Sequence, residues 1–183
     1  MHLLETRDLP VINGEKVSLR PITDADTDDI VRWRNDPEIR RFFLFRETFT
    51  PEMHRAWLRD KVGTGRVIQY IIIDRDSGRG VGSVYFRDVD AKNESAEYGI
   101  FIGERRARRR GIGTETARLF TRFGLDVLRL HRISLKVLGG NEIARRSYEK
   151  AGFRTEGVFR DFVKLDGAFT DVVFMARIAG EGE

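Results

Sequence analysis

One short segment of the chain combines residue types and a spacing that suit phosphate binding. Residues 108–114 read Arg-Arg-Arg-Gly-Ile-Gly-Thr and lie between a predicted strand and a predicted helix. The first amides of a helix lack partners within it and lie at the positive end of its dipole, so they bind phosphate or pyrophosphate. Glycine lets the backbone wrap closely around such an anion. We predict a phosphate-binding loop made of Arg108, Arg109, Arg110, Gly111, Ile112, Gly113 and Thr114.

Other readings of this loop stay open at the level of its own residues. A glycine pattern this short also fits an exposed helix cap beside a solvated basic patch. Two common nucleotide motifs are excluded, because a Walker loop requires Gly-Lys-Ser/Thr and a dinucleotide fingerprint requires three glycines in G-x-G-x-x-G order. If the loop does bind phosphate, its guanidinium groups can add charge-assisted hydrogen bonds to peripheral phosphates.

Composition sets further limits on the class of protein. The 183 residues suffice for one domain with a buried core. Cysteine is absent, and the three histidines show no metal-ligand spacing, so we expect neither disulfides nor a metal site. Residues 1–8 lack the apolar run of a secretory signal, and no segment approaches the ~20 apolar residues that span a bilayer. We therefore expect a cytoplasmic protein that does not contact the membrane.

Positive charge is concentrated in one place. Lysine and arginine outnumber the acidic residues by 33 to 29, which gives a formal net charge of +4, and five arginines crowd residues 105–110. Such a spot suits a polyanion or a phosphorylated small molecule. A nucleic-acid-binding module is one alternative. We do not favour a nucleic-acid partner, because the segment lacks interleaved aromatic residues for base stacking.

The first half of the chain predicts a hairpin, two helices and three strands. An Asn-Gly pair at 13–14 separates two apolar-rich runs and predicts a hairpin over about 9–22. Thr23-Asp24 predicts the start of a helix that ends near 35–37, and a second helix covers 51–62. On that second helix we interpret His54 as a surface residue. Residues rich in β-branched and aromatic side chains predict strands over 67–73, 81–89 and 95–102.

The second half alternates strands with helices and closes in a hairpin. Beyond Gly113, apolar residues recur at three- and four-residue spacings, which predicts a helix. A strand over 133–137 leads through a Gly-Gly-Asn turn into a helix that ends at Gly152. An Asp-Gly pair at 166–167 predicts a closing hairpin over about 158–178. Repeats and long linkers are absent from the sequence, so we expect one domain over 1–183.

Two blocks in this order resemble the GNAT superfamily of N-acetyltransferases, in the branch of ribosomal-protein N-terminal, spermidine and amino-sugar acetyltransferases. The R/Q-x-x-G-x-G/A loop is matched by Arg108, Gly111 and Gly113. Many members carry glycine where Arg109 stands. Segments 19–21, 33–38 and 130–132 resemble this branch as well. The second block, Asn-x-x-Ala-x-x-x-Tyr-Glu-Lys-x-Gly-Phe, is matched by Asn141, Ala144, Tyr148, Glu149, Lys150, Gly152 and Phe153.

The resemblance implies an α/β (α+β) fold of the GNAT type. Its mixed, mostly antiparallel sheet splays open between the fourth and fifth strands, which end at Ile102 and Leu138, and helices flank both faces. Acetyl-CoA, the implied cosubstrate, lies in that split. By similarity, residues of about 95–153 form the cofactor-binding half. The residues expected to contact the cofactor, besides the loop at 108–114, are Ile100, Phe101, Ile102, Asn141, Arg145 and Tyr148.

The implied reaction is direct acetyl transfer to a primary amine, and it assigns two catalytic residues. A lysine-like amine has a pKa of ~10.4, so its proton must be accepted before it can attack. Glu97 matches a family position used as a water-mediated base, although a structural salt bridge explains a carboxylate there equally well. Tyr148 matches the position where a phenol donates a proton to the leaving sulfur. The alternative, a core tyrosine on an amphipathic helix, is the weaker reading.

The acceptor is the least determined part of the prediction. We favour a protein N-terminal α-amine or a small amine metabolite, with an amino sugar or a polyamine as alternatives. Residues Trp33, Arg34, Asn35, Phe42, Phe43 and Phe45 fall where this branch builds its acceptor pocket, without individual roles. A non-catalytic CoA-binding sensor is an alternative of another class, and the sequence leaves a homodimer open.

Overall fold

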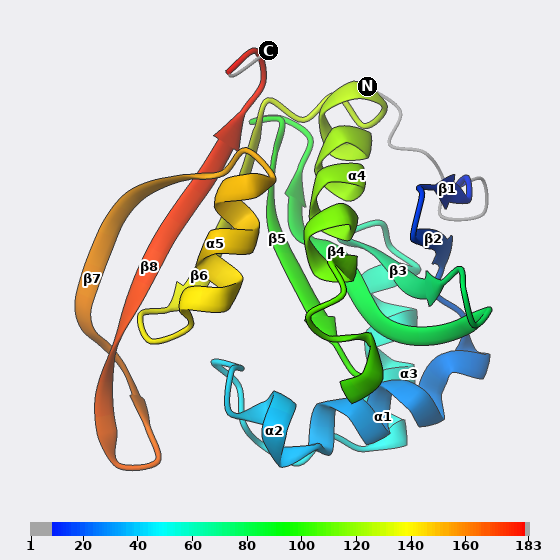
Figure 1. Ribbon diagram of the computed structural model, residues 1–183, viewed down its shortest axis with the longest axis horizontal. Helices are drawn as coiled ribbons and strands as arrows, with labels where there is room; N and C mark the ends of the chain where they lie inside the picture. The colour runs from blue at the N-terminus through cyan, green and yellow to red at the C-terminus, as the bar shows by residue number, and fades with distance from the viewer. Residues whose placement is uncertain (1–8, 182–183) are drawn as a thin grey trace.

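The computed structural model describes residues 9–181. Residues 1–8, the segment in which we expect no secretory signal, and residues 182–183 lie outside this range. The described strands form one sheet in the order β1-β2-β3-β4-β5-β6-β8-β7, in which only β5 and β6 pair in parallel (Figure 1). The strands are β1 (Ile12–Asn13), β2 (Val17–Pro21), β3 (Val67–Asp74), β4 (Arg79–Asp90), β5 (Ser95–Ile102), β6 (Arg132–Leu138), β7 (Arg154–Leu165) and β8 (Ala168–Ile178).

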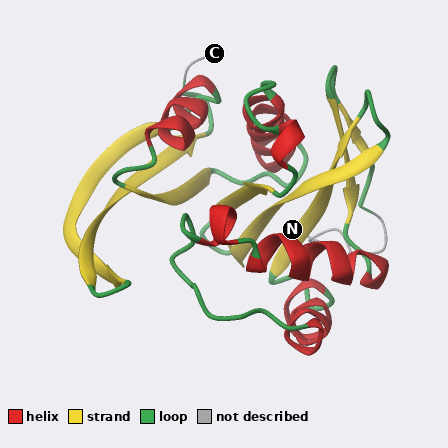
Figure 2. Ribbon diagram, turned by 60° about the horizontal axis from the view of Figure 1, so that its bottom comes forward, coloured by secondary structure: helices red, strands yellow, loops and turns green. Residues whose placement is uncertain are grey.

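Helices cover both faces of the sheet, as expected for the GNAT fold. Two of them, α4 and α5, lie on one face, and α1 and α3 lie on the other (Figure 2). None of the helices within residues 9–181 is long and apolar enough to cross a membrane. The helices are α1 (Thr27–Asn35), α2 (Pro37–Arg40), α3 (Pro51–Trp57), which continues as a π-helical turn (Leu58–Val62), α4 (Ile112–Asp126) and α5 (Glu142–Lys150), with 3-10 turns at Asp24–Asp26 and Arg105–Ala107.

Two hydrophobic cores hold these layers together, and β5 contributes to both. On the α4 face, Phe120 stacks on Phe86 with ring centroids 4.3 Å apart, and Tyr98 packs beside them. On the α1 face, Trp33 meets Phe101 edge to face at 6.3 Å. Successive side chains of a strand point to opposite faces, so Tyr98 and Phe101 project into different cores. The backbone of β5 is therefore fixed from both sides.

Most predicted elements are confirmed, and the differences have local causes. The hairpin β1–β2 is shorter than predicted, since β1 begins only at Ile12, and Asn13 pairs with Ser18 inside the ladder instead of forming the turn. Strand β7 begins at Arg154, four residues before the predicted start, and two bulges interrupt its pairing with β8. The short helix α2 was not predicted. It forms because Asp36 caps it by accepting a hydrogen bond from the Glu38 amide at 2.8 Å, with proline in the first turn.

His54 is buried, so its interpretation as a surface residue was wrong. Its side chain lies between α3 and α1, where Nδ1 is 2.9 Å from the hydroxyl of Thr27. Its Nε2 is buried without a hydrogen-bond partner among the described residues. Burial lowers the pKa of His54, against the opposing effect of Asp24 and Asp26. The face of α3 that carries His54, which we predicted to be exposed, instead packs against α1.

We predict that this buried imidazole makes stability depend on pH. The unfolded chain protonates His54 near its ordinary pKa of ~6.5, whereas the folded state resists protonation, so the free energy of unfolding falls as pH drops below that value. Denaturant titrations from pH 7.5 to 5 should show this loss, with a slope of at most ~1.4 kcal/mol per pH unit for one proton. His54→Gln should flatten the slope, and exposed His131→Gln should not. Equal slopes in wild type and His54→Gln would contradict the assignment.

Candidate active site

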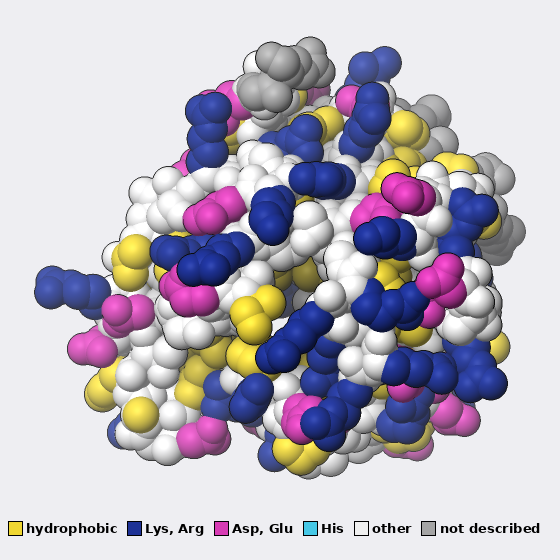
Figure 3. Space-filling model, viewed as in Figure 1, with side chains coloured by type: hydrophobic (Ala, Val, Ile, Leu, Met, Phe, Trp, Pro, Cys, Tyr) yellow, Lys and Arg dark blue, Asp and Glu magenta, His cyan; other side chains and the backbone are white. Residues whose placement is uncertain are grey.

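The sheet opens between β5 and β6. Their parallel pairing covers only residues 95–97 of β5 and 132–134 of β6, after which the strands diverge (Figure 1). Beyond that point β5 stays bonded to β4 on its other side, while β6 stays bonded to β8. The edge of β5 formed by residues 98–102 therefore has no strand partner in the described structure. This is the split expected between the strands that end at Ile102 and Leu138. A hollow lies near the middle of the face of the molecule that is turned to the viewer in Figure 1 (Figure 3).

The predicted phosphate loop begins α4 next to the open end of β5. Gly111 is the N-cap residue and has φ +82°, a conformation that favours glycine. No side chain caps this end of α4, so the first amides of a 15-residue helix keep their hydrogen-bonding capacity. At Gly113 there is also space, since a Cβ there would lie 3.9 Å from the side chain of Ile102. The helix start is thus bare and adjoins the split.

Two arginines of this loop are engaged in structural ion pairs. Arg110 pairs with Asp74 at 3.0 Å and with Asp76 at 2.6 Å, which ties the loop to the turn after β3. Arg108 pairs with Glu38 of α2 at 3.1 Å. In this structure both guanidinium groups are bound to carboxylates, and their contact with peripheral phosphates stays a prediction. Their ion pairs fix the shape of the loop, whose first backbone amides are not capped by a side chain.

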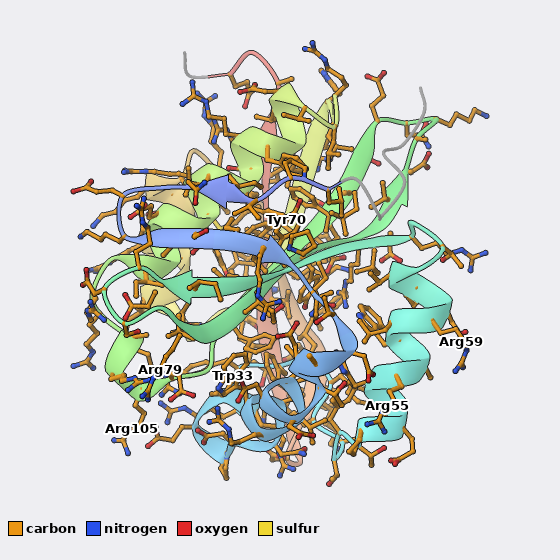
Figure 4. All side chains as sticks on the ribbon, turned by 90° about the vertical axis from the view of Figure 1, so that its right-hand side faces the viewer. Trp33, Arg55, Arg59, Tyr70, Arg79 and Arg105 are labelled. Atoms are coloured by element: carbon orange, nitrogen blue, oxygen red, sulfur yellow. The ribbon has the colours of Figure 1, made fainter. Side chains whose placement is uncertain are left out.

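The other arginines of the cluster diverge. Arg109 adopts φ +61°, a left-handed conformation that is strained for a residue with a side chain. Arg105 and Arg106 line an open hollow of about 710 Å³ beside α1, together with Arg79 from the start of β4 (Figure 4). No residue of β6 or α5 lines that hollow, so it is separate from the split. Arg105 also meets Glu38, at 3.4 Å, so this carboxylate lies between Arg105 and Arg108.

Helix α5 forms the opposite wall of the split. Asn141 caps it by accepting a hydrogen bond from the amide of Ala144 at 3.3 Å. The hydroxyls of Thr114 and Ser147 lie 2.8 Å apart and connect α4 to α5. Arg145 pairs with Glu142 at 2.7 Å along the same helix. The structure therefore brings Thr114 and the α5 residues of the second block to one place.

Tyr148 lies on α5 against the open stretch of β5. Its ring meets Tyr98 edge to face at 6.0 Å and Phe153 at 6.0 Å, and burial raises its pKa. Within residues 9–181 its hydroxyl makes no hydrogen bond to another side chain or to the backbone. The hydroxyl of Tyr98 is fully buried and also without a partner. An unpartnered hydroxyl is costly in a closed core, so that of Tyr98, next to Tyr148 and the split, is consistent with a site that a ligand or water completes.

Glu97 lies where the split begins, on the face opposite Tyr98. Its Oε1 accepts hydrogen bonds from Arg87 of β4, and its Oε2 accepts one from Lys136 of β6 at 2.9 Å. The carboxylate is 15% exposed. This network connects three neighbouring strands at the last paired residue of β5, so Glu97 does form the salt bridge that the sequence left as an alternative to a base.

The acceptor-pocket residues named from the sequence separate into different environments. Trp33 is core, with 1% exposure, and its Nε1 donates to Glu104 at 2.9 Å. Asn35 holds the following loop, because its side chain donates to the carbonyl of Phe49 and accepts from that residue's amide, both at 2.8 Å. Phe43 packs on Phe101 of β5 at 5.5 Å. Phe42 and Phe45 are exposed.

Three side chains at the split were not singled out by the sequence. Tyr85 packs flat on β5, where a Cβ at Gly99 would come within 2.5 Å of its ring. Arg87 and Lys136 hold Glu97. Register explains Tyr85 and Arg87, which oppose Gly99 and Glu97 in the β4–β5 ladder. Lys136 follows by two residues Ser134, which pairs with Glu97 in the β5–β6 ladder. Alternation along β4 was visible in the sequence, but this pairing was not.

Comparisons with known proteins agree with this geometry. Residues 16–154 match the family model described as an acetyltransferase (GNAT) domain. An uncharacterised N-acetyltransferase of Bacillus licheniformis, p20, is 25% identical over 174 residues, which cover 91% of this chain and 95% of that protein. The spermidine N-acetyltransferase of Vibrio cholerae, solved with CoA and spermine, superposes with a TM-score of 0.84 at 20% identity over 90% of this chain and 96% of its own.

A third relative is named for a different acceptor. The ribosomal-protein-S5-alanine acetyltransferase of Vibrio fischeri superposes with a TM-score of 0.81 at 19% identity, over 95% of this chain and 99% of its own. At these identities the superpositions show the fold alone. The family model spans most of the chain, so the chain belongs to the GNAT acetyltransferase family. It is an acyltransferase of a family that uses acetyl-CoA.

Proposed function

We propose that the chain transfers the acetyl group of acetyl-CoA directly onto a primary amine, with the cosubstrate in the split between β5 and β6. The observation that carries this proposal is that a bare helix start and an unpaired strand edge adjoin each other. Amides at a helix N-terminus suit a pyrophosphate, and an open strand edge suits the amide groups of a pantetheine arm. The whole described sheet acts as one domain, since β7 and β8, which lie mostly or wholly beyond the matched residues, complete it next to β6.

The cofactor contacts follow from this placement. The backbone of Ile100, Phe101 and Ile102 would pair with the pantetheine arm. The amides of residues 109–114 would hold the pyrophosphate, with the side chains of Arg108 and Arg110 fixing the loop. On the other wall, Asn141 and Arg145 would contact the cofactor from α5. Glycine at 111 and 113 supports this arrangement, because it leaves room for an anion against the backbone.

The reaction requires that the amine lose one proton and that the departing thiolate gain one. The thioester supplies an activated acetyl group, which the neutral amine attacks without a covalent enzyme intermediate. Tyr148 donates its hydroxyl proton to the departing sulfur, and burial keeps that proton in place at neutral pH. Glu97 accepts the amine's proton through a water. Both oxygens of Glu97 already accept hydrogen bonds, so that water approaches alongside Arg87 and Lys136.

The acceptor we favour is a protein N-terminal α-amine or a small amine metabolite. An amino sugar or a polyamine is the alternative within the same reaction, and the Vibrio cholerae relative carries spermine in its structure. The alternative of another class is a CoA-binding sensor without catalysis. Release of free thiol from acetyl-CoA in the presence of an amine panel separates these readings. Tight CoA binding with no thiol release would favour the sensor.

Tyr148→Phe tests the proton donor. The change keeps the ring that packs on Tyr98 and Phe153 but removes the transferable proton, so kcat should fall by about 10²-fold while the affinity for CoA stays within about threefold. The measurement is steady-state thiol release beside calorimetric CoA binding. Tyr70→Phe, which alters a core hydroxyl bonded to Pro10, is the matched control and should leave kcat unchanged. Unchanged turnover in Tyr148→Phe would remove the assignment.

Glu97→Gln tests the base against the structural ion pair. If the carboxylate accepts the proton, kcat/KM should fall by about 10- to 100-fold near neutral pH and recover at high pH, where the amine loses its proton unaided. Lys136→Met is the control, because it weakens the same network and keeps the carboxylate. A pH-independent loss of equal size in both variants, with equal loss of thermal stability, would show that Glu97 acts only by holding the strands.

A further inference from the structure

Arg34 carries a positive charge that no described residue neutralises. It makes no ion pair and no hydrogen bond within residues 9–181, and its Nε is fully buried without a partner. The guanidinium instead lies over the rings of Phe43 and Phe49, at 4.8 and 4.6 Å from their centroids. Other arginines of the site, such as Arg108 and Arg110, are ion-paired. Half-buried Arg177 also lacks an ion pair but donates to Thr121 and to the Ala151 carbonyl, whereas the guanidinium of Arg34 has neither an anion nor a hydrogen-bond acceptor among the described residues.

The position of Arg34 places this charge beside the proposed site of acetyl transfer. Phe43, over which it lies, packs at 5.5 Å on Phe101 of β5, whose backbone lies on the open edge. Tyr85, which packs on Gly99 of the same edge, acts to raise the pKa of Arg34 against the larger effect of burial. Arg34 thus lies on the acceptor side of β5, opposite the face covered by α4 and α5.

The charges around Arg34 leave the site short of negative charge. Burial lowers the pKa of Arg34, and the neighbouring charge of Arg87 lowers it further. No carboxylate within residues 9–181 forms an ion pair with Arg34. The neighbouring Glu97 is shared between Arg87 and Lys136. Arg87 also meets Asp88 at 4.0 Å, so Arg87 and Lys136 both have acidic partners, while Arg34 has none within residues 9–181.

We propose that the acceptor amine carries an anionic group, a carboxylate or a phosphate, which binds Arg34. This inference rests on the acetyltransferase function proposed above. A guanidinium presents several N–H donors in a planar fork that matches either anion, and its interaction with one gains strength where solvent is excluded. The rings of Phe43 and Phe49 and the bonds of Asn35 to Phe49 hold the fork in place. A polyamine would instead bring further positive charge to an already cationic site.

The test on the wild-type protein compares acceptors that differ only in the anion. One arm pairs a free amino acid with its carboxamide, and the other pairs an amino-sugar phosphate with the unphosphorylated sugar, with spermidine as a cationic reference. Thiol release gives kcat/KM for each. In one arm we expect kcat/KM for the anionic acceptor to exceed that for its neutral partner by about tenfold or more, and to exceed that for spermidine. The arm that shows this preference identifies the anion. Equal or reversed ratios in both arms would overturn the inference.

Substitution of Arg34 tests whether this residue causes the preference for anionic acceptors. In Arg34→Gln the ratio of anionic to neutral acceptor should fall to about one, mainly through a higher KM for the anionic acceptor, while Arg34→Lys should keep part of it. Arg55→Gln, on the exposed face of α3, should keep the wild-type ratio. Should Arg34→Gln not fold, as judged by circular dichroism, Arg34→Lys still carries the test, because a point charge in place of the fork should lower the ratio. A ratio retained in both Arg34 variants would overturn the inference.

The two proposals fail in different ways. Thiol release with several amines but without an anionic preference would sink the acceptor inference and leave acetyl transfer standing. No thiol release with any amine, in protein that still folds, would sink the proposed function and the acceptor inference together. Stabilisation of the protein by CoA alone, measured as a shift in melting temperature, separates a cofactor-binding protein from one in which the split is not a site.

Discussion

The feature on which the rest depends is that β5 is held firmly along one edge and left open along the other. Its bonds to β4 and its side chains in two cores fix its backbone, so the strand stays extended after β6 has turned away. Backbone N–H and C=O groups on the open edge must find partners, because unpaired ones are costly. Pairing to β8 holds β6 on its own course, and the Glu97 network marks the last point at which the two strands meet.

The second organising feature is the distribution of positive charge around that opening. The arginine-rich segment after β5 looks like one patch in the sequence, yet Arg108 and Arg110 are bound to acidic residues on α2 and near the end of β3. The polar groups without a side-chain partner at the start of α4 are its backbone amides. By contrast Arg34, which the sequence placed among the acceptor-pocket residues without a role of its own, keeps its charge unpaired. In our proposal, the site selects its acceptor through the unpaired charge of Arg34 rather than through the dense arginines of residues 105–110.

The sequence was sufficient for the element order and for the loop, because both depend on local signals. Strand alternation placed β3 to β6 within a few residues, and Gly111 and Gly113 identified a helix start that the structure leaves uncapped. The burial of His54 could not be foreseen, since it depends on how α3 packs on α1. The same holds for Arg87 and Lys136, which reach Glu97 only through strand register. Side-chain contacts across the sheet join residues that are far apart in the sequence, so the periodicity of one segment does not predict them.

A titration of isotope-labelled protein with CoA, followed through the backbone amide signals, tests whether the bare helix start and the open edge of β5 hold the cofactor. We expect the largest changes on residues 109–114 at the start of α4 and on residues 98–102 along the open edge of β5. Changes confined instead to the arginine-lined hollow around Arg79 and Arg106, with the helix start and β5 unaffected, would contradict this expectation.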